Sequence, residues 1–153
     1  MDISVVIPTY NKARSIHETL VEVKNACDSF KLSYEVLVVD DHSTDKTYNE
    51  IVKTIKGWMN FRVFERVKNG GKGGALKEGF LKAKGDLVAF IDADLDLPPK
   101  QLKVFIDLMN VYGAEAVIGS KRNSLSQVKY SITRNFLSSL AIFLNFLFLK
   151  GVF

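Results

Sequence analysis

Short, predominantly apolar runs alternate along the chain with segments of helical periodicity, and this alternation limits the possible folds more than any other feature. Runs rich in β-branched and aliphatic residues recur at 3–7, 35–39, 61–64, 87–91 and 116–118. Runs without a regular polar face are typical of strands that are buried on both sides, as in parallel sheets. We therefore predict five strands in a mostly parallel sheet.

Apolar residues between these runs repeat with the spacing of a helix face. The predicted faces consist of Ile16, Leu20, Val23 and Cys27, of Leu76, Phe80 and Ala83, and of Leu102, Phe105, Ile106 and Met109. Helices that alternate with parallel strands cover both sides of the sheet, which gives an α/β fold of three layers. With 153 residues, 47% of them apolar and 25% charged, the chain fits one globular domain.

The cysteine content indicates the cellular compartment, and the charge distribution indicates which classes of partner to expect. Cys27 is the only cysteine, and the first residues carry no basic run that would begin a secretory signal, so we expect a reducing cytoplasm. The net charge is +4, and residues 100–153 carry seven Lys or Arg against two acidic residues. A basic tail beside an apolar segment favours an anionic membrane surface or a phosphate ligand over nucleic acid.

Polar residues gather in the loops that follow the predicted strands. In open α/β sheets, ligands bind beyond the carboxyl ends of the strands, where loops lead into helices. The loops at this edge comprise residues 8–11, 40–45 and 92–99. We therefore look for the chemistry of the protein in these three loops.

The last of these loops holds an acidic cluster, Asp92, Asp94 and Asp96. Carboxylates this close repel one another unless a cation or hydrogen-bond donors compensate. Mg²⁺ or Mn²⁺ would do so, because these ions take hard oxygen ligands, commonly one or two carboxylates together with substrate phosphates. The alternative is a solvated turn before the helix that Pro98 and Pro99 open, and the spacing alone favours neither.

The loop after the second strand begins with two adjacent carboxylates, Asp40 and Asp41. They can accept hydrogen bonds from a nucleobase N–H or from ribose hydroxyls, as an acidic residue does in dinucleotide-binding folds. Ser43 and Asp45, in contrast, are better explained as N-caps of the next helix.

The glycine-rich run 68–74 resembles a phosphate cradle, because bare backbone and Lys72 precede a helix. It does not match the Walker template, which requires Ser or Thr after the lysine, where Gly73 stands. The alternative is a flexible entry into a helix that packs closely on the sheet through Gly79.

Residues 136–149 are apolar nearly all round. As a helix they would span about 21 Å, less than the roughly 30 Å hydrocarbon core, so we do not expect them to cross a bilayer alone. We expect this segment to meet a membrane interface, to support self-association, or to contact a missing part of the protein. A core helix is the alternative.

Four motifs in order carry a resemblance to a known family: residues 5–11, 38–47, 69–75 and 92–94. They resemble the family 2 glycosyltransferases, and most of all the dolichyl-phosphate mannosyltransferase and glucosyltransferase branch. The resemblance implies a Rossmann-like nucleotide-binding domain of the GT-A type. It also implies transfer of a sugar from a nucleotide-sugar donor to a polyprenyl phosphate, by a protein bound peripherally at the cytoplasmic face of the membrane.

The resemblance also implies roles for individual residues. Those that match the nucleoside pocket are Pro8, Tyr10, Val38 and Asp40, with Asp41 beside them. Those that match the motif for the diphosphate and the divalent metal, Mg²⁺ or Mn²⁺, are Asp92, Ala93 and Asp94. The acidic cluster itself makes Asp96 a third candidate metal ligand, and the glycine-rich run makes Lys72 a candidate substrate-binding residue.

Basic residues that match the branch lie nearer the end of the chain, at Lys121 or Arg122 and at Arg134. Their charges would neutralise the diphosphate leaving group or the acceptor phosphate. The expected catalytic residues are Asp94 and Arg134.

Three features depart from the family pattern. Lys12 stands where many relatives have Glu, and Asp96 stands where many have Gln or a small polar residue. The chain also ends after the apolar segment, so we expect a nucleotide-sugar-binding domain at 1–125, a truncated interface helix at 126–153 and no acceptor half. Two rival hypotheses are a truncated binding module without turnover and a nucleotidyltransferase-like enzyme.

Overall fold

All neighbouring strands of the sheet run parallel, and the first strand lies inside it. The computed structural model describes residues 1–119, of which Met1–Val117 form one compact unit. The strand order is β3-β2-β1-β4. Along the chain the elements are β1 (Ile3–Thr9), α1 (Ile16–Asp28), β2 (Tyr34–Asp40), α2 (Thr47–Thr54), β3 (Phe61–Glu65), α3 (Gly71–Lys82), β4 (Leu87–Phe90) and α4 (Gln101–Tyr112).

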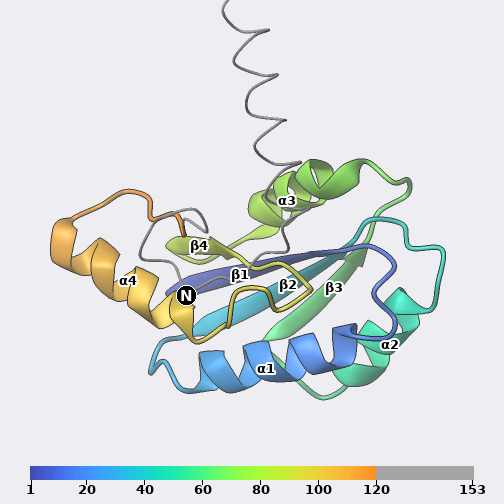
Figure 1. Ribbon diagram of the computed structural model, residues 1–153, viewed down its shortest axis with the longest axis horizontal. Helices are drawn as coiled ribbons and strands as arrows, with labels where there is room; N and C mark the ends of the chain where they lie inside the picture. The colour runs from blue at the N-terminus through green and yellow to red at the C-terminus, as the bar shows by residue number, and fades with distance from the viewer. Residues whose placement is uncertain (120–153) are drawn as a thin grey trace, which may run out of the picture. The chain divides into compact units, whose positions relative to one another are not determined.

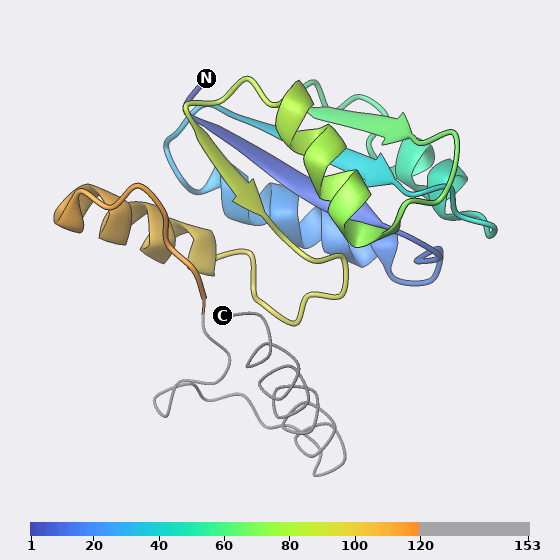
Figure 2. The ribbon, with the colours of Figure 1, turned by 90° about the horizontal axis from the view of Figure 1, so that it is seen from above.

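Helices cover both faces of the sheet, which confirms the predicted three-layer α/β class. Figures 1 and 2 show α1 and α2 on one face and α3 on the other. Because side chains alternate along a strand, Val5 and Ile7 of β1 pack toward α1 while Val6 packs toward α3. Both faces of β1 and β2 are therefore fully buried, as their apolar sequences predict.

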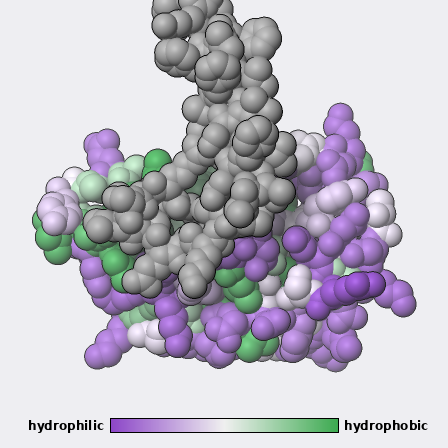
Figure 3. All heavy atoms as spheres, viewed as in Figure 1, coloured by the Kyte–Doolittle hydropathy of each residue, from purple (hydrophilic) through white to green (hydrophobic). Residues whose placement is uncertain are grey.

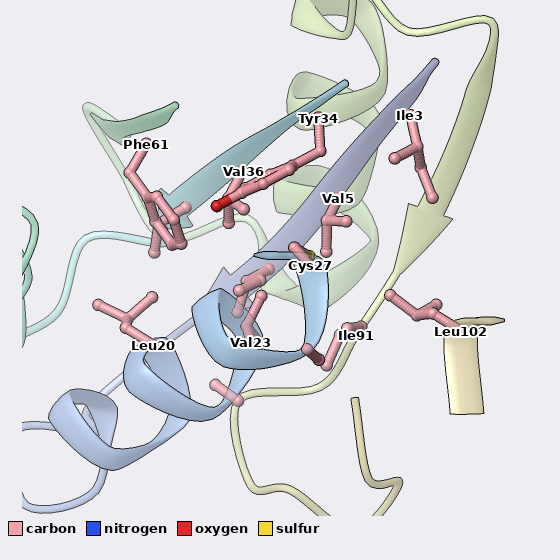
Figure 4. Packing of buried hydrophobic residues seen from close by; sticks show 14 of the residues in the cluster. Ile3, Val5, Leu20, Val23, Cys27, Tyr34, Val36, Phe61, Ile91 and Leu102 are labelled. Carbon is pink, nitrogen blue, oxygen red and sulfur yellow. The ribbon is translucent and has the colours of Figure 1, made fainter. Parts of the chain in front are cut away.

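The larger core lies between the sheet and α1. Leu20, Val23 and Cys27 of α1 approach Val5 and Val36 of the central strands (Figure 4). Each of these large side chains stabilises the fold by about 1.5–3 kcal/mol through burial. Burial also raises the pKa of Cys27 to about 12, so this thiol stays protonated and belongs to the core.

The face of α3 that meets the sheet differs in part from the predicted one. Ala75 and Gly79 are buried against the strands, whereas Phe80 is 55% exposed. A Cβ on Gly79 would lie 2.3 Å from Cγ1 of Val6. The helix approaches the sheet so closely that its smallest residues occupy the contact line, which confirms that Gly79 faces the sheet and shows that Phe80 does not.

Strands β1 and β4 separate at their carboxyl ends. Their pairing ends at Val6 and Phe90, apart from the bond that the Ile91 amide donates to the Val6 carbonyl at 3.1 Å. Pro8, which has no N–H, lies beyond that point. Since β2 and β4 flank β1 on opposite sides, this is the switch point at which open α/β sheets bind ligands.

The predicted fifth strand at 116–118 is wrong for the described part of the chain, where the sheet has four strands. A strand needs a neighbour to pair with its backbone, and the Ile118 side chain is instead 88% exposed. Helix α4 buries Leu102 and Ile106, as predicted, and exposes Val104 and Val111 on its other side. Figure 3 shows apolar surface in the region of α4.

Within residues 1–119, no helix is long and apolar enough to span a bilayer.

A buried polar cluster ties the amino ends of the strands together. Glu35 Oε1 accepts hydrogen bonds from the Ser4 hydroxyl and the Lys84 amide, both at 2.7 Å. Its Oε2 forms an ion pair with Arg62 at 2.5 Å. Burial raises the pKa of Glu35, but these three interactions outweigh burial and hold the pKa below its ordinary value.

Candidate functional site

A pocket of about 210 Å³ opens at the carboxyl ends of β1 and β4. It is formed by the ends of these two strands, the start of the loop after β2 and the first turns of α3. Its lining residues are Pro8, Thr9, Tyr10, Lys12, Asp41, Lys72, Ala75, Asp92, Ala93 and Asp94. The pocket therefore occupies the switch point of the sheet.

Helix α1 anchors the acidic loop that forms one wall of the pocket. The Thr19 hydroxyl, fully buried, donates to the Ala93 carbonyl at 3.0 Å. Across the pocket, Lys72 Nζ lies 2.5 Å from Asp92 Oδ1. Both side chains are about half exposed, so this pair is open to water and worth at most about 1 kcal/mol. A ligand that binds either group can therefore replace it at small cost.

The three aspartates of the acidic loop do not converge on one point. Asp94 Oδ1 accepts the Asp96 amide at 3.1 Å, and Asp96 does not line the pocket. In the described residues, no three His, Cys, Asp or Glu side chains come together as a metal-ligand set. Two carboxylates, Asp92 and Asp94, do line the pocket, and this set fits a hard divalent cation that also takes phosphate oxygens.

The adjacent Asp40 and Asp41 have different surroundings. Asp40 is fully buried and accepts hydrogen bonds from Thr9 Oγ1 at 3.2 Å, Ser43 Oγ at 2.5 Å and the Ser43 amide at 3.1 Å. Asp41 lines the pocket instead. Of the two carboxylates, Asp41 is the one that a ligand in the pocket can reach.

Asp41 is held by groups from the β3–α3 connection. Its Oδ1 forms an ion pair with Arg66 Nη1 and accepts the Gly70 amide at 3.0 Å. Arg66 Nε also lies 3.2 Å from Glu78 Oε2. The hydrogen bond and charge of Asp41 raise the pKa of Arg66 above its ordinary value.

The loops after β1 and β2 are joined by side-chain hydrogen bonds. Asn11, at φ 51°, donates its amide to Ser43 Oγ at 2.9 Å and accepts the Thr44 amide at 2.9 Å. Ser43 thus binds Asp40 and Asn11, and its predicted role as a helix cap is wrong. Asp45 accepts the Thr47 amide at 2.9 Å and so supports the start of α2, but it lies one residue before the N-cap position, Lys46.

Asp45 also accepts the Ala13 amide at 3.2 Å, which adds a second link between the two loops. Burial raises the pKa of Asp45, but the hydrogen bonds from Thr47 and Ala13 hold it below its ordinary value. This carboxylate is therefore ionised, and each of its two oxygens accepts a hydrogen bond from the protein.

Comparison with models of known protein families identifies the family of this chain. The model of glycosyl transferase family 2 matches residues 4–147, which is nearly the whole sequence. The chain belongs to glycosyl transferase family 2. The predicted resemblance is thereby confirmed.

Two curated relatives illustrate the similarity. A dolichol-phosphate mannosyltransferase of Pyrococcus furiosus is 36% identical over 121 residues, 79% of this chain and 33% of that protein. An undecaprenyl-phosphate 4-deoxy-4-formamido-L-arabinose transferase of Edwardsiella ictaluri is 38% identical over 107 residues, 69% of this chain and 33% of that protein. This chain thus spans about a third of the length of these relatives.

Solved structures confirm the GT-A type of fold. The mannosyltransferase PcManGT from Pyrobaculum calidifontis, in complex with GDP-Man and Mn²⁺, gives a TM-score of 0.63 at 28% identity, with 70% of this chain and 32% of that chain covered. TarS of S. aureus in complex with UDP-GlcNAc gives 0.61 at 29% identity, with 83% and 37% covered.

The structure brings together most of the site residues predicted for this family 2 chain. Pocket-lining residues among them are Pro8, Tyr10, Asp41, Lys72, Asp92, Ala93 and Asp94. Val38 packs in the core, and Asp40 is buried beneath the pocket. Lys121, Arg122, Arg134 and the interface segment 136–149 lie outside the described residues.

Sequence reasoning missed Arg66 and Thr9. Arg66 follows β3 in a loop of mixed polarity, and no spacing in the sequence links it to Asp41, 25 residues earlier. A signal was present in the glycines at 70 and 74, whose missing side chains leave room for a neighbour. The sequence does not say which neighbour that is.

Proposed function

We propose that this chain is the donor-binding part of a glycosyltransferase that transfers a sugar from a nucleotide diphosphate to a polyprenyl phosphate. The observation that carries the proposal is the pocket at the switch point, in which Asp41 stands toward β2 and Asp92 and Asp94 toward β4. One site thus combines a hydrogen-bond acceptor for the nucleoside, Asp41, with a pair of carboxylates for the metal that binds the diphosphate, Asp92 and Asp94. Family membership and the names of the relatives support this assignment.

Residues at the two ends of the pocket have different roles in this proposal. Pro8 and Tyr10 form an apolar and aromatic wall for the nucleoside, and Asp41 accepts a hydrogen bond from it. Lys72 exchanges Asp92 for a phosphate oxygen of the donor, since an ammonium group binds either anion. The nucleotide is thereby oriented with its diphosphate beside the acidic loop.

Asp92 and Asp94 would hold the divalent metal, Mn²⁺ or Mg²⁺, and a bound metal stabilises the charge of the departing diphosphate. Mn²⁺ accompanies GDP-Man in the similar mannosyltransferase structure. In the transfer, an oxygen of the acceptor phosphate forms a bond to the anomeric carbon as the bond from that carbon to the diphosphate breaks. Lys121, Arg122 and Arg134 are proposed to balance the phosphate charges, and Asp94 and Arg134 remain the proposed catalytic residues.

A polyprenyl acceptor is membrane-bound, so we propose that the protein works as a peripheral protein at the cytoplasmic membrane face. The basic residues of the tail and the apolar segment 136–149 support this location, because such segments bind anionic surfaces. The same segment is proposed to support self-association in the absence of lipid.

Titration calorimetry with UDP and GDP tests the donor site. With Mn²⁺ we expect binding of at least one of the two nucleotides, and in EDTA much weaker binding, because the phosphates and the acidic loop would repel each other. Equal affinity in EDTA would overturn the metal assignment. Absence of binding under both conditions would overturn the donor site.

A second candidate function is a nucleotide-sugar-binding module without turnover, and one observation favours it. The pocket residues all come before residue 95, and they match only the donor side of the proposed reaction. Binding depends on contacts that are present in the ground state and can survive the loss of acceptor positioning. A radiolabelled nucleotide sugar and a short polyprenyl phosphate decide between the two: transfer at roughly 1 per second indicates an enzyme, and binding without transfer indicates a module.

A further inference from the structure

Arg66 joins three segments that meet beside the pocket. Its guanidinium pairs with Asp41 after β2 and with Glu78 of α3, while Arg66 itself follows β3. The Arg66 side chain is 19% exposed and that of Asp41 only 4%, so the pair is largely shielded from water. We use the name Arg66 clamp for Arg66, its partners Asp41 and Glu78, and the two glycines that make room for it, Gly70 and Gly74.

Two glycines of the α3 start leave the space that the guanidinium fills. A Cβ on Gly70 would lie 2.5 Å from Arg66 Nη1, and one on Gly74 would lie 2.8 Å from the same atom. A Cβ on Gly73, between them, would meet nothing within 4 Å. The glycine-rich run therefore serves at least in part to seat Arg66, which neither the cradle nor the flexible-entry interpretation included.

The clamp leaves one oxygen of Asp41 for a ligand. Arg66 and the Gly70 amide both bind Oδ1. Within residues 1–119, both of these contacts fall on the same oxygen, and the residue lines the pocket. A carboxylate fixed through one oxygen presents the other in a defined direction, which favours a directional hydrogen bond to a bound nucleoside.

We propose that Arg66 is a positioning residue for the nucleoside end of the donor site, acting through Asp41 and the first turn of α3. This inference rests on the proposed function, since it assumes that the pocket takes a nucleotide. It assigns to Arg66 no contact with the diphosphate, which belongs beside Asp92 at the other end of the pocket. Loss of the clamp is thus expected to weaken nucleoside recognition and to spare pyrophosphate.

The decisive variant is Gly74→Ala in the full 153-residue chain. The Cβ that it adds meets only the far end of a flexible side chain, so the guanidinium moves away while the helix stays formed. Gly73→Ala is the matched control, because it makes the same change one residue earlier and contacts nothing. Arg66→Met removes the positive charge directly. Arg66→Lys keeps a positive charge that can pair with Asp41, but an ammonium group lacks the planar, forked guanidinium that pairs with Asp41 and Glu78 at the same time.

Calorimetry in Mn²⁺ with UDP, GDP and inorganic pyrophosphate provides the readout, with thermal unfolding as a check of folding. We expect Gly74→Ala and Arg66→Met to lose about tenfold or more in affinity for the nucleotide that the unaltered chain binds. Pyrophosphate affinity should change less than about twofold, Gly73→Ala should bind like the unaltered chain, and Arg66→Lys should recover part of the loss.

The outcomes separate this inference from the proposed function. Undiminished nucleotide affinity in folded Gly74→Ala overturns the inference alone, as does an equal loss for nucleotide and pyrophosphate, which would show a merely structural role. No binding of UDP or GDP by the unaltered chain overturns the proposed function and the inference with it. If Arg66→Met does not fold, Gly74→Ala decides.

Discussion

Two arginine–carboxylate pairs link β2 and β3 at opposite ends of the sheet. At the amino end, Glu35 uses both of its oxygens within the protein, for Ser4, the Lys84 amide and Arg62. At the carboxyl end, Asp41 uses Oδ1 for both Arg66 and the Gly70 amide, and the residue lines the pocket.

The difference shows that the same pair of residue types has two uses. A carboxylate with all its acceptor positions filled can only stabilise the fold, because a ligand finds nothing to bind. A carboxylate held through one oxygen remains available and directed. Substitutions in the amino-end cluster should therefore lower the free energy of unfolding, whereas substitutions in the carboxyl-end cluster should lower ligand affinity. Four experiments test this division.

The largest effect is expected for Asp94→Asn at the carboxyl end. The variant should lose most of the Mn²⁺-dependent part of nucleotide affinity, about a hundredfold or roughly 2.7 kcal/mol, because an amide oxygen is a much poorer cation ligand. Stability should change little, since Asp94 is exposed. Calorimetry with and without Mn²⁺ measures this, and unchanged Mn²⁺ dependence would remove Asp94 from the metal site.

Glu35→Ala at the amino end should have the opposite effect. It leaves the Ser4 hydroxyl without its acceptor and Arg62 without its partner, and it removes the shorter of the two hydrogen bonds of the Lys84 amide, which keeps Ser4 Oγ at 3.1 Å. We expect a loss of about 2–3 kcal/mol in the free energy of unfolding, measured in urea. Nucleotide affinity of the folded protein should stay the same. A loss of affinity at unchanged stability would break the division between the two ends.

Lowering the pH should reduce the stabilisation that the amino-end cluster provides. Because the pKa of Glu35 is lower in the folded chain than in the unfolded one, the unfolded state binds more protons as the pH falls below the ordinary value of about 4.3. The stabilisation by Glu35 is thus complete above that pH and is lost as pH falls through the lowered pKa.

Glu35→Gln should make the unfolding free energy decline less steeply as the pH falls below the ordinary glutamate pKa of about 4.3. Urea unfolding of both proteins across this range measures the difference. Asp2, Asp28 and Asp45 also have lowered pKa values and remain in both proteins, so they cancel in the comparison. Parallel pH curves would exclude Glu35 as a source of acid sensitivity.

The smallest effect is expected for Asp45→Asn. Asp45 lies at the carboxyl end, but both of its oxygens accept hydrogen bonds, from the Ala13 and Thr47 amides. It should therefore behave like Glu35 at the amino end. We expect a loss of about 0.5–1 kcal/mol in stability, since Asn is also a good cap, and unchanged nucleotide affinity. If nucleotide affinity fell, position along the sheet would matter more than whether an oxygen is free.

Much of the fold follows from local sequence. The runs that form β1 and β2 are apolar on both faces, and only a covered parallel sheet buries both. The α1 face at Ile16, Leu20 and Val23 is buried as its spacing predicts. The placement of Asp92 and Asp94 at the pocket also follows, because the loop after a parallel strand emerges at the carboxyl edge of the sheet, where ligands bind.

Tertiary structure alone decided the roles of neighbouring residues with the same chemistry. Asp40 and Asp41 are the same residue type in sequence, yet successive side chains at the end of a strand point to opposite sides, so one is buried under Ser43 and the other reaches the pocket. Ser43 pairs with Asn11 across 32 residues of sequence rather than with its own helix.

Arg66 shows the same limit most clearly. Its partners Asp41 and Glu78 belong to different elements, and the space for its guanidinium exists only because α3 starts beside it with glycine at 70 and 74. Periodicity and local motifs report which side chains share a helix face or a strand face. They do not report which charged groups meet across elements, because those distances depend on how closely each helix packs on the sheet.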